Sequence, residues 1–131
     1  LSFFSPSGYE NKKNYSGADH IIYLPLDTPK NAHKIIDEIN PEIVLWVKYE
    51  YWFNLLRELN KRNIPVYLVS SIFRKDQWFF HPLAGNFLRQ LQKVRHFFVQ
   101  DPDSEKLLHA AGIRQVTVSG DTRFDRVMTV A

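Results

Sequence analysis

The sequence predicts an α/β protein with a Rossmann-like open parallel sheet and helices on both faces of that sheet. Short runs of mostly apolar residues recur along the 131-residue chain, and segments with apolar residues at helical spacing lie between them. Continuous apolar runs suit strands that are covered on both faces, as in a parallel sheet. The repeated alternation of strand and helix indicates right-handed crossovers within one sheet.

The predicted strands are five short runs, and the start of the chain supplies a possible sixth. Each run is apolar over most of its length, whereas the segments between the runs carry most of the charged residues. The five runs cover residues 20–24, 42–47, 65–72, 96–100 and 116–120, and the sixth covers residues 1–4.

Four helices are predicted between these strands. Thr28 before Pro29 and Asp101 before Pro102 have the N-cap-then-proline order that starts a helix, and Gly112 stands where a glycine ends the fourth one. The apolar positions of the four helices are Ala32, Ile35, Ile36 and Ile39; Trp52, Leu55, Leu56 and Leu59; Phe87, Leu88, Leu91 and Val94; and Leu107, Leu108 and Ala111.

Residues 72–86 form the one long irregular segment, which contains three consecutive aromatic residues, Trp78, Phe79 and Phe80. Three adjacent side chains cannot all face one core from a regular helix. Two interpretations stay open. The aromatic residues wedge between sheet and helix, or they form an apolar surface for a partner, lipid or a second domain.

Composition limits the classes of function. The hydrophobic content of 44% can bury one core and suits a single domain, and the absence of cysteine excludes disulfides and thiolate metal sites. The five histidines lack the spacing of metal ligands, and no phosphate-binding glycine motif or nucleophile elbow is present, so we expect no metal and no cofactor. No apolar run approaches the ~20 residues of a membrane helix.

The charge and the ends of the chain lead to two further expectations. A net charge of +3 is small, and the short basic runs lack the interleaved aromatic residues of a nucleic-acid platform, so no nucleic-acid partner is expected. The chain begins at Leu1 without a methionine and ends at Ala131 without a polar tail. We therefore expect it to be a piece of a longer protein.

Polar and charged residues follow each predicted strand. Because ligands of open α/β sheets bind at the carboxyl ends of the strands, these residues are the candidates for a site. They lie in residues 5–10, 25–28, 48–50, 70–75, 100–101 and 120–126.

Each candidate has a simpler alternative. Lys48 and Glu50 lie between a strand and a helix, where they form either a surface pair with Glu50 favoured at the helix N-terminus, or part of a cleft. Arg74 and Lys75 are either solvated or hold an anionic sugar or phosphate.

Two interpretations are also open for Ser5, Ser7 and Gly8. They make either a plain turn or a cradle of small residues and free amides for an oxyanion or a phosphate.

Six motifs in order resemble the N-terminal domain of bacterial 3-deoxy-D-manno-octulosonic acid (Kdo) transferases. The resemblance covers nearly the whole chain. The motifs are FFSPSGYE (3–10), YLPLDTPKNA (23–32), VKYEYWFNLLREL (47–59), IPVYLVSSIFRKDQ (64–77), FFVQDPDSEKLL (97–108) and VTVSGDTRFDRV (116–127).

The resemblance implies half of a GT-B glycosyltransferase, an inverting, metal-independent enzyme with two Rossmann-like domains. Such an enzyme transfers Kdo from CMP-Kdo to a phosphorylated lipid A precursor at the cytoplasmic face of the inner membrane. Residues 1–131 would be its acceptor-side domain and inactive alone. The membrane anchor and the loop with the catalytic base would precede Leu1, and the donor domain would follow Ala131.

The resemblance also implies roles for individual residues. Glu50 and Lys48 would help to build the cleft between the domains, with Glu50 orienting the acceptor or supporting the absent base. Arg74 and Arg123, together with Lys48, would bind acceptor phosphates or the Kdo carboxylate. Ser71, at a position where glycine is common in the family, would contact substrate.

Ser5, Ser7 and Gly8 would shape the loop under the sugar. Besides Ser71, the chain departs from the family at Phe53, where many relatives are expected to have proline.

Two alternatives to this function remain open. One is the acceptor half of a different GT-B enzyme that uses a UDP sugar. The other is a receiver-like signalling module, although such a module needs an acidic pocket and the central strand here ends in Lys48.

Overall fold

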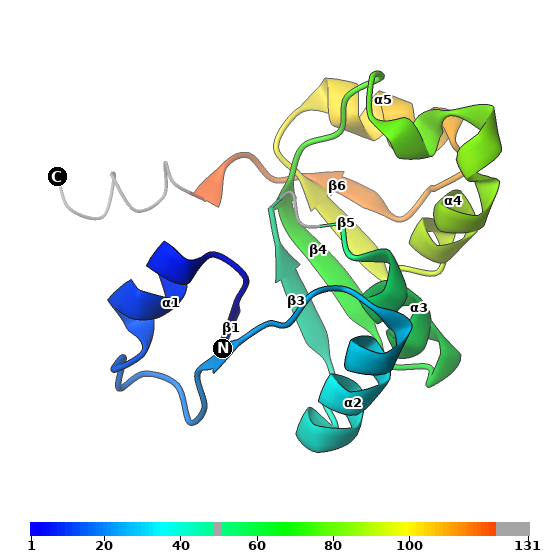
Figure 1. The fold of residues 1–131 in the computed structure, drawn as a ribbon. Helices are drawn as coiled ribbons and strands as arrows, with labels where there is room; N and C mark the ends of the chain where they lie inside the picture. The colour runs from blue at the N-terminus through cyan, green and yellow to red at the C-terminus, as the bar shows by residue number, and fades with distance from the viewer. Residues whose placement is uncertain (49–50, 123–131) are drawn as a thin grey trace, which may run out of the picture.

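A computed structural model describes residues 1–48 and 51–122 of the chain (Figure 1). Strands and helices alternate along the chain, as the sequence predicts. The elements are β1 (Ser2–Phe3), α1 (Pro6–Lys12), β2 (Ile22–Tyr23), α2 (Pro29–Ile39), β3 (Val44–Val47), α3 (Phe53–Lys61), β4 (Val66–Ser71), the 3₁₀ turns η1 (Trp78–Phe80) and η2 (Pro82–Ala84), α4 (Gly85–Gln92), β5 (His96–Val99), α5 (Pro102–Ala110) and β6 (Val116–Val118).

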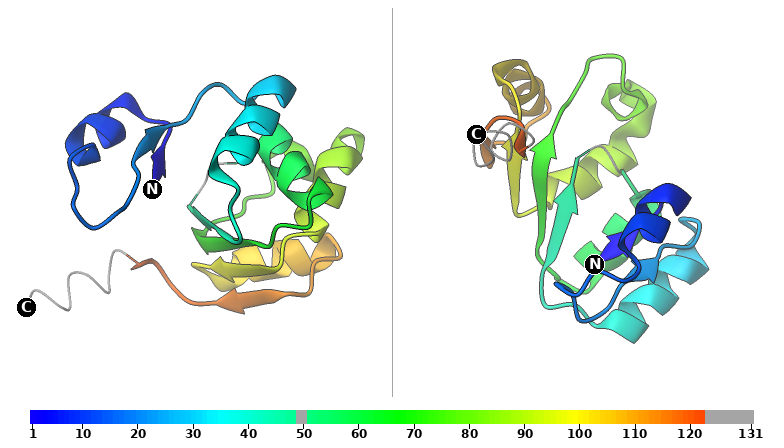
Figure 2. Two further views of the ribbon diagram at one scale, coloured as in Figure 1. Left: turned by 90° about the horizontal axis from the view of Figure 1, so that it is seen from below. Right: turned by 90° about the vertical axis from the view of Figure 1, so that its left-hand side faces the viewer.

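The strands form a parallel four-stranded sheet in the order β3-β4-β5-β6 and a separate parallel pair, β1-β2. Residues Val44 and Val66 stand opposite each other in the β3-β4 ladder, so the parallel pairing predicted for these two runs is confirmed. Figure 2 shows β1 and β2 standing apart from the larger sheet. The predicted α/β class, with a parallel sheet flanked by helices, is confirmed.

The predicted helix ends are confirmed where the signal is local. Thr28 Oγ1 accepts a hydrogen bond from the Asn31 amide at 3.2 Å, and Asp101 Oδ1 accepts one from the Ser104 amide at 2.7 Å. Gly112 has a φ of 80°, a left-handed conformation that glycine adopts without strain, just beyond the last residue of α5.

One core lies between the four-stranded sheet and its helices. Leu56 and Leu59 of α3 pack into it, and α4 contributes Leu91. β5 contributes Phe97 and Val99, both completely buried. The helices α3 and α4 thus cover the sheet with the apolar stripes that the sequence predicts.

The aromatic segment is divided between core and surface. Phe79 is buried in the core, whereas the side chain of Trp78 is 59% exposed and that of Leu83 is 92% exposed. Phe79 therefore wedges into the core as the first interpretation has it, and the prediction that part of this surface is solvent-exposed is confirmed. Contact of this surface with lipid or another domain stays a prediction.

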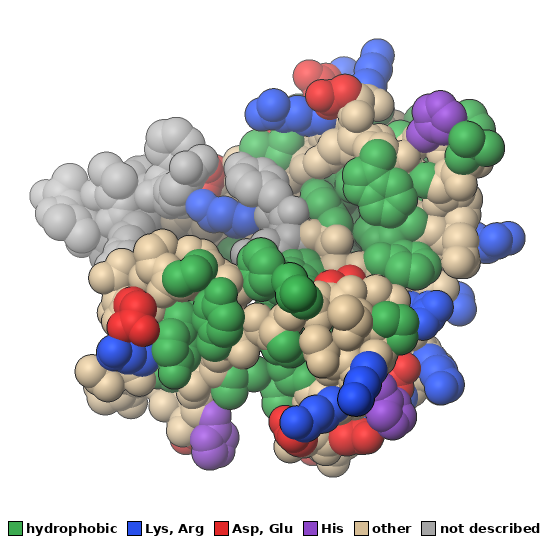
Figure 3. Space-filling view, viewed as in Figure 1, with side chains coloured by type: hydrophobic (Ala, Val, Ile, Leu, Met, Phe, Trp, Pro, Cys, Tyr) green, Lys and Arg blue, Asp and Glu red, His purple; other side chains and the backbone are tan. Residues whose placement is uncertain are grey.

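A charged cluster joins α2 to α3. Glu58 accepts a hydrogen bond from Arg62 Nε at 2.9 Å and lies 3.0 Å from His33 Nδ1, and Arg62 also pairs with Asp37 at 2.6 Å. Figure 3 shows side chains of both charge signs gathered over these helices in the lower part of the view. The hydrogen bond with His33, helped by Arg62 and opposed by burial, lowers the pKa of Glu58.

No helix within residues 1–48 and 51–122 is long and apolar enough to span a lipid bilayer.

Candidate functional site

The carboxyl edge of the four-stranded sheet contains three residues in left-handed backbone conformations. Lys48 follows β3 with a φ of 68°, Ser70 lies near the end of β4 with a φ of 55°, and Gly120 follows β6 with a φ of 78°. Positive φ is uncommon for residues other than glycine, and such strained positions cluster at binding and catalytic sites. Positive φ also occurs at the opposite end of the sheet, at Asn40 before β3 and Asn63 before β4, so the conformation alone does not single out the carboxyl edge.

A bulge at the end of β4 turns two adjacent serines into the interior. The ladder with β5 shifts register between Val69 and Ser71, and both Ser70 and Ser71 are completely buried. Bulges reorient side chains and are frequent next to active sites. In this protein the bulge brings two hydroxyl groups to the edge of the sheet.

The hydroxyl of Ser70 ties three strand ends together. Gln100 Nε2, just after β5, donates to Ser70 Oγ at 3.1 Å and to the Ser70 carbonyl at 2.8 Å. The Thr122 amide, beyond β6, donates to the same Oγ at 3.4 Å. Ser70 is therefore an organising residue that sequence analysis did not single out.

The hydroxyl of Ser71 has no hydrogen-bond partner among the described residues, although it is completely buried. Burying an unsatisfied hydroxyl costs about 1–3 kcal/mol. The sequence resemblance marks the same residue as a departure from a common glycine. Contact of this hydroxyl with a substrate stays a prediction.

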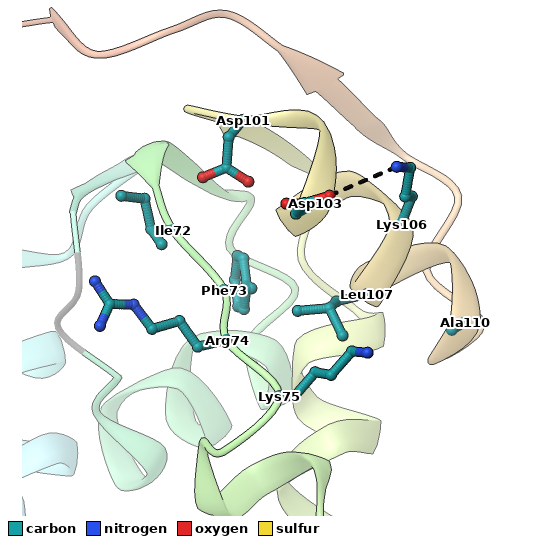
Figure 4. Close-up of a pocket in the computed structure, with 9 residues that line it drawn as sticks. All are labelled: Ile72, Phe73, Arg74, Lys75, Asp101, Asp103, Lys106, Leu107 and Ala110. Carbon is teal, nitrogen blue, oxygen red and sulfur yellow. Dashed lines mark ion pairs between the residues drawn. The ribbon is translucent and has the colours of Figure 1, made fainter.

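Arg74 and Lys75 line a cavity of about 670 Å³ beyond β4. Its wall includes Asp101, which caps α5, and the exposed pair Asp103 and Lys106, 3.5 Å apart. Figure 4 shows Arg74 and Lys75 extending to opposite sides of their segment. Among the described residues, neither side chain forms an ion pair with a carboxylate.

Ser104 fixes the backbone from which Arg74 projects. Its buried Oγ accepts a hydrogen bond from the Phe73 amide at 2.8 Å, and its amide is bonded to Asp101. The Arg74 amide donates to Gln77 Oε1 at 2.9 Å. Sequence analysis missed Ser104, because its partner lies 31 residues away; only its position three residues after the capping Asp101 is a local signal.

Asp27 holds the start of α3, near the other end of the edge. Its carboxylate accepts the amides of Asn54 and Leu55, both at 2.9 Å, and its carbonyl accepts Asn54 Nδ2 at 2.8 Å. Glu50 lies outside the described residues. Asp27 thus satisfies two of the amides at the start of α3.

The structure gives Ser5, Ser7 and Gly8 a local role at the start of α1. Ser5 is the N-cap, with its Oγ 3.4 Å from the Gly8 amide and 2.8 Å from Ser7 Oγ. A Cβ at Gly8 would lie 3.1 Å from the ring of Phe3, which explains a small residue there. Their contact with a sugar stays a prediction.

The described part of the predicted site thus falls into two groups. Lys48, Ser71 and Arg74 lie at the carboxyl edge of the four-stranded sheet, whereas Ser5, Ser7 and Gly8 lie at α1, beside the separate β1-β2 pair. Arg123, like Glu50, lies outside the described residues.

Comparison with known proteins identifies the family. Residues 1–126 match the family model of 3-deoxy-D-manno-octulosonic-acid transferase (kdotransferase). A 3-deoxy-D-manno-octulosonic acid transferase of Haemophilus influenzae is 33% identical over 93% of this chain and 30% of its own length. A bifunctional glycosyltransferase/methyltransferase of Fusobacterium nucleatum is 30% identical over 95% of this chain and 20% of its own length.

The chain therefore spans less than a third of the length of these curated relatives. The family match covers almost all of the chain, in agreement with the six motifs and with the parallel α/β fold. The chain belongs to the 3-deoxy-D-manno-octulosonic-acid transferase (kdotransferase) family.

Proposed function

We propose that residues 1–131 are the acceptor-side Rossmann-like domain of a GT-B enzyme that transfers Kdo from CMP-Kdo to a phosphorylated lipid A precursor. CMP-Kdo would bind mainly to a second domain, and the whole enzyme would work at the cytoplasmic face of the inner membrane. Family membership and the name of the Haemophilus relative support the sugar. The position of the cations supports the acceptor.

The observation that carries this proposal is the carboxyl edge of the sheet. There, among the residues that the structure describes, the Ser71 hydroxyl has no hydrogen-bond partner and the Arg74 guanidinium forms no ion pair. A guanidinium recognises phosphate and carboxylate groups by paired hydrogen bonds. Lys48 and Arg123 would add charge for the acceptor phosphates or the Kdo carboxylate.

Inverting transfer needs a base for the acceptor hydroxyl, a donor held in line and stabilisation of the departing CMP phosphate. In our proposal the main base lies outside this chain, no metal takes part, and Glu50 orients the acceptor or supports that base. Ser71 donates a hydrogen bond to the acceptor, while Ser5, Ser7 and Gly8 shape the loop under the sugar.

The acceptor assignment is tested by steady-state kinetics of the Arg74→Ala variant. The variant is made in a longer protein, of about the same length as the curated relatives. We expect the KM for the phosphorylated acceptor to rise about 10-fold or more, the scale of one lost charge-assisted hydrogen bond, with the KM for CMP-Kdo almost unchanged. Arg89→Ala is the matched control, because Arg89 is exposed on α4. Equal acceptor KM values for both variants would refute the role of Arg74.

A second candidate is the acceptor half of another GT-B glycosyltransferase that uses a UDP sugar. The name of the Fusobacterium relative, which specifies a glycosyltransferase without naming its sugar, is the observation that favours it. Assays with CMP-Kdo and with UDP sugars in parallel separate the two candidates.

A further inference from the structure

The segment that carries Arg74 lies between the end of β4 at Ser71 and the start of η1 at Trp78. The structure describes all of residues 72–77, and they form neither helix nor strand. A side chain on such an irregular segment is held only as firmly as the contacts of that segment allow. The contacts of residues 72–74 with other elements therefore determine how firmly Arg74 is held.

Ser104 of α5 binds the backbone of Phe73. Its Oγ accepts a hydrogen bond from the Phe73 amide at 2.8 Å and donates one to the Phe73 carbonyl at 3.4 Å. A serine hydroxyl has one hydrogen and two lone pairs, so it can serve both backbone groups. Both residues are buried, and buried backbone groups need partners. The Ser104 hydroxyl therefore does for Phe73 what a neighbouring strand does in a sheet.

Ser104 is itself fixed in place at the start of α5. Its amide donates to Oδ1 of Asp101, the N-cap residue of α5, at 2.7 Å, and its side chain is completely buried. In Figure 4 the segment with Phe73 and Arg74 runs beside this end of α5. Because the hydroxyl has little freedom to move, the position that it imposes on Phe73 is well defined.

Tyr51 binds the same segment from the side of α3. Its hydroxyl donates to the Ile72 carbonyl at 3.0 Å. Its ring centroid lies 5.5 Å from that of Phe73 and 4.9 Å from that of Phe79, so the ring is packed against the core. Tyr51 and Ser104 thus bond two consecutive residues, Ile72 and Phe73, from two different parts of the fold.

Arg74 is the next residue along the chain. Its amide donates to Gln77 Oε1 at 2.9 Å, so its backbone is bonded as well. Its side chain is exposed and forms no ion pair within the part of the chain that the structure describes. A fixed backbone below an unpaired guanidinium is the arrangement that a residue needs in order to bind an anionic ligand without first being ordered.

We propose that Ser104 and Tyr51 are positioning residues, which hold Arg74 in place for an anionic group of the acceptor without touching the acceptor themselves. The proposal rests on the role that the proposed function gives to Arg74. A loosely held Arg74 would have to be ordered when the acceptor binds, and this loss of freedom would weaken binding. Removal of either hydroxyl therefore weakens acceptor binding through Arg74.

The variants Ser104→Ala and Tyr51→Phe measure this effect in a longer protein, of about the same length as the curated relatives. We expect each variant to raise the KM for the acceptor about 3- to 10-fold, the scale of one hydrogen bond, with kcat almost unchanged. Tyr51→Phe keeps the ring that packs against Phe73. It therefore decides the question even if Ser104→Ala does not fold.

The matched control is Asn60→Ala. Asn60 Nδ2 donates to the carbonyl and to Oε1 of Gln90 at 3.1 and 3.0 Å, so this variant also removes hydrogen bonds between two elements. Asn60 lies near the end of α3, before β4 begins, whereas Arg74 follows the end of β4. We expect Asn60→Ala to lower the melting temperature and to leave the acceptor KM unchanged. An equal rise in KM for this control would overturn the proposal.

A double-mutant cycle separates the positioning of Arg74 from a general structural role. In an Arg74→Ala background we expect Ser104→Ala and Tyr51→Phe to change the acceptor KM by less than about twofold, because the group that they position is gone.

Two results would overturn the positioning role alone. One is an unchanged acceptor KM for either single variant beside a raised KM for Arg74→Ala. The other is a set of KM increases that multiply in the double variants. An unchanged acceptor KM for Arg74→Ala would instead refute the proposed acceptor role of Arg74, and this proposal with it.

Discussion

Ser70 and Ser71 are neighbours at the end of β4 with opposite hydrogen-bonding environments. Ser70 takes part in bonds with Gln100 and Thr122, which support its left-handed backbone, whereas the Ser71 hydroxyl has no partner among the described residues. Strain of this kind persists only where surrounding contacts impose it. We interpret Ser70 as the structural residue of the pair, whereas contact of the completely buried Ser71 with a substrate stays a prediction.

Replacement of Ser71 by alanine separates stability from function. The Ser71→Ala variant removes a buried, unsatisfied hydroxyl, so we expect an unchanged or higher melting temperature, with a gain of up to ~1 kcal/mol. In a protein as long as the curated relatives, the same variant is expected to raise the KM for the acceptor several-fold. Thermal melting and kinetics measured together check this, and a lower melting temperature with unchanged kinetics would mean that Ser71 serves only the fold.

Glu50 is tested by removing its charge with little change in shape. In the longer protein we expect Glu50→Gln to lose about 10²-fold or more in turnover, the scale of one positioned acid-base group, while keeping its melting temperature. Asp27→Ala is the comparison variant, since Asp27 bonds the amides at the start of α3 and its loss should lower the melting temperature. Near-normal turnover of Glu50→Gln with a lowered melting temperature would identify Glu50 as a cap alone.

At the scale of the elements, contacts near in sequence were predictable and distant ones were not. Thr28 and Asp101 cap helices through residues three positions on, so their roles follow from local order. Asp27 caps α3 from 27 residues away, and Ser104 bonds Phe73 across 31 residues. Such partners depend on how the elements pack, which no local spacing encodes.

The charged cluster between α2 and α3 predicts a pH dependence of stability. The pKa of Glu58 is lower in the folded protein than its ordinary value, because His33 and Arg62 favour the carboxylate. Stability from Glu58 is therefore present above that value and is lost as the pH falls through the lower, folded pKa. We expect the melting temperature of Glu58→Gln to fall less steeply than that of the unchanged protein as the pH is lowered through this acid range. Glu42→Gln is the control, because Glu42 is exposed before β3. Equal slopes for Glu58→Gln and the unchanged protein would contradict this prediction.

At the scale of the whole molecule, the sequence predicts one parallel sheet and the described residues form two. All six predicted runs are strands, because their apolar composition is a local property. The division into two sheets arises because β1 and β3 do not pair, although a groove lined by both lies between them. Composition does not reveal such a groove, since it depends on which strands become neighbours.

The exposed apolar surface around Trp78 and Leu83 also concerns the molecule as a whole. Its exposure agrees with a surface that contacts lipid or another domain in the longer protein. Such a contact would bring the adjacent Arg74 toward a lipid-linked acceptor, which is consistent with the proposed function.

The central claim is tested most directly by the transfer reaction itself. A protein of the relatives' length, incubated with CMP-Kdo and a phosphorylated lipid A precursor in the presence of EDTA, is expected to yield acceptor carrying added Kdo, measured by mass spectrometry. A product that forms with a UDP sugar and not with CMP-Kdo, or transfer that stops when metal is chelated, would contradict the assignment of a metal-independent Kdo transferase.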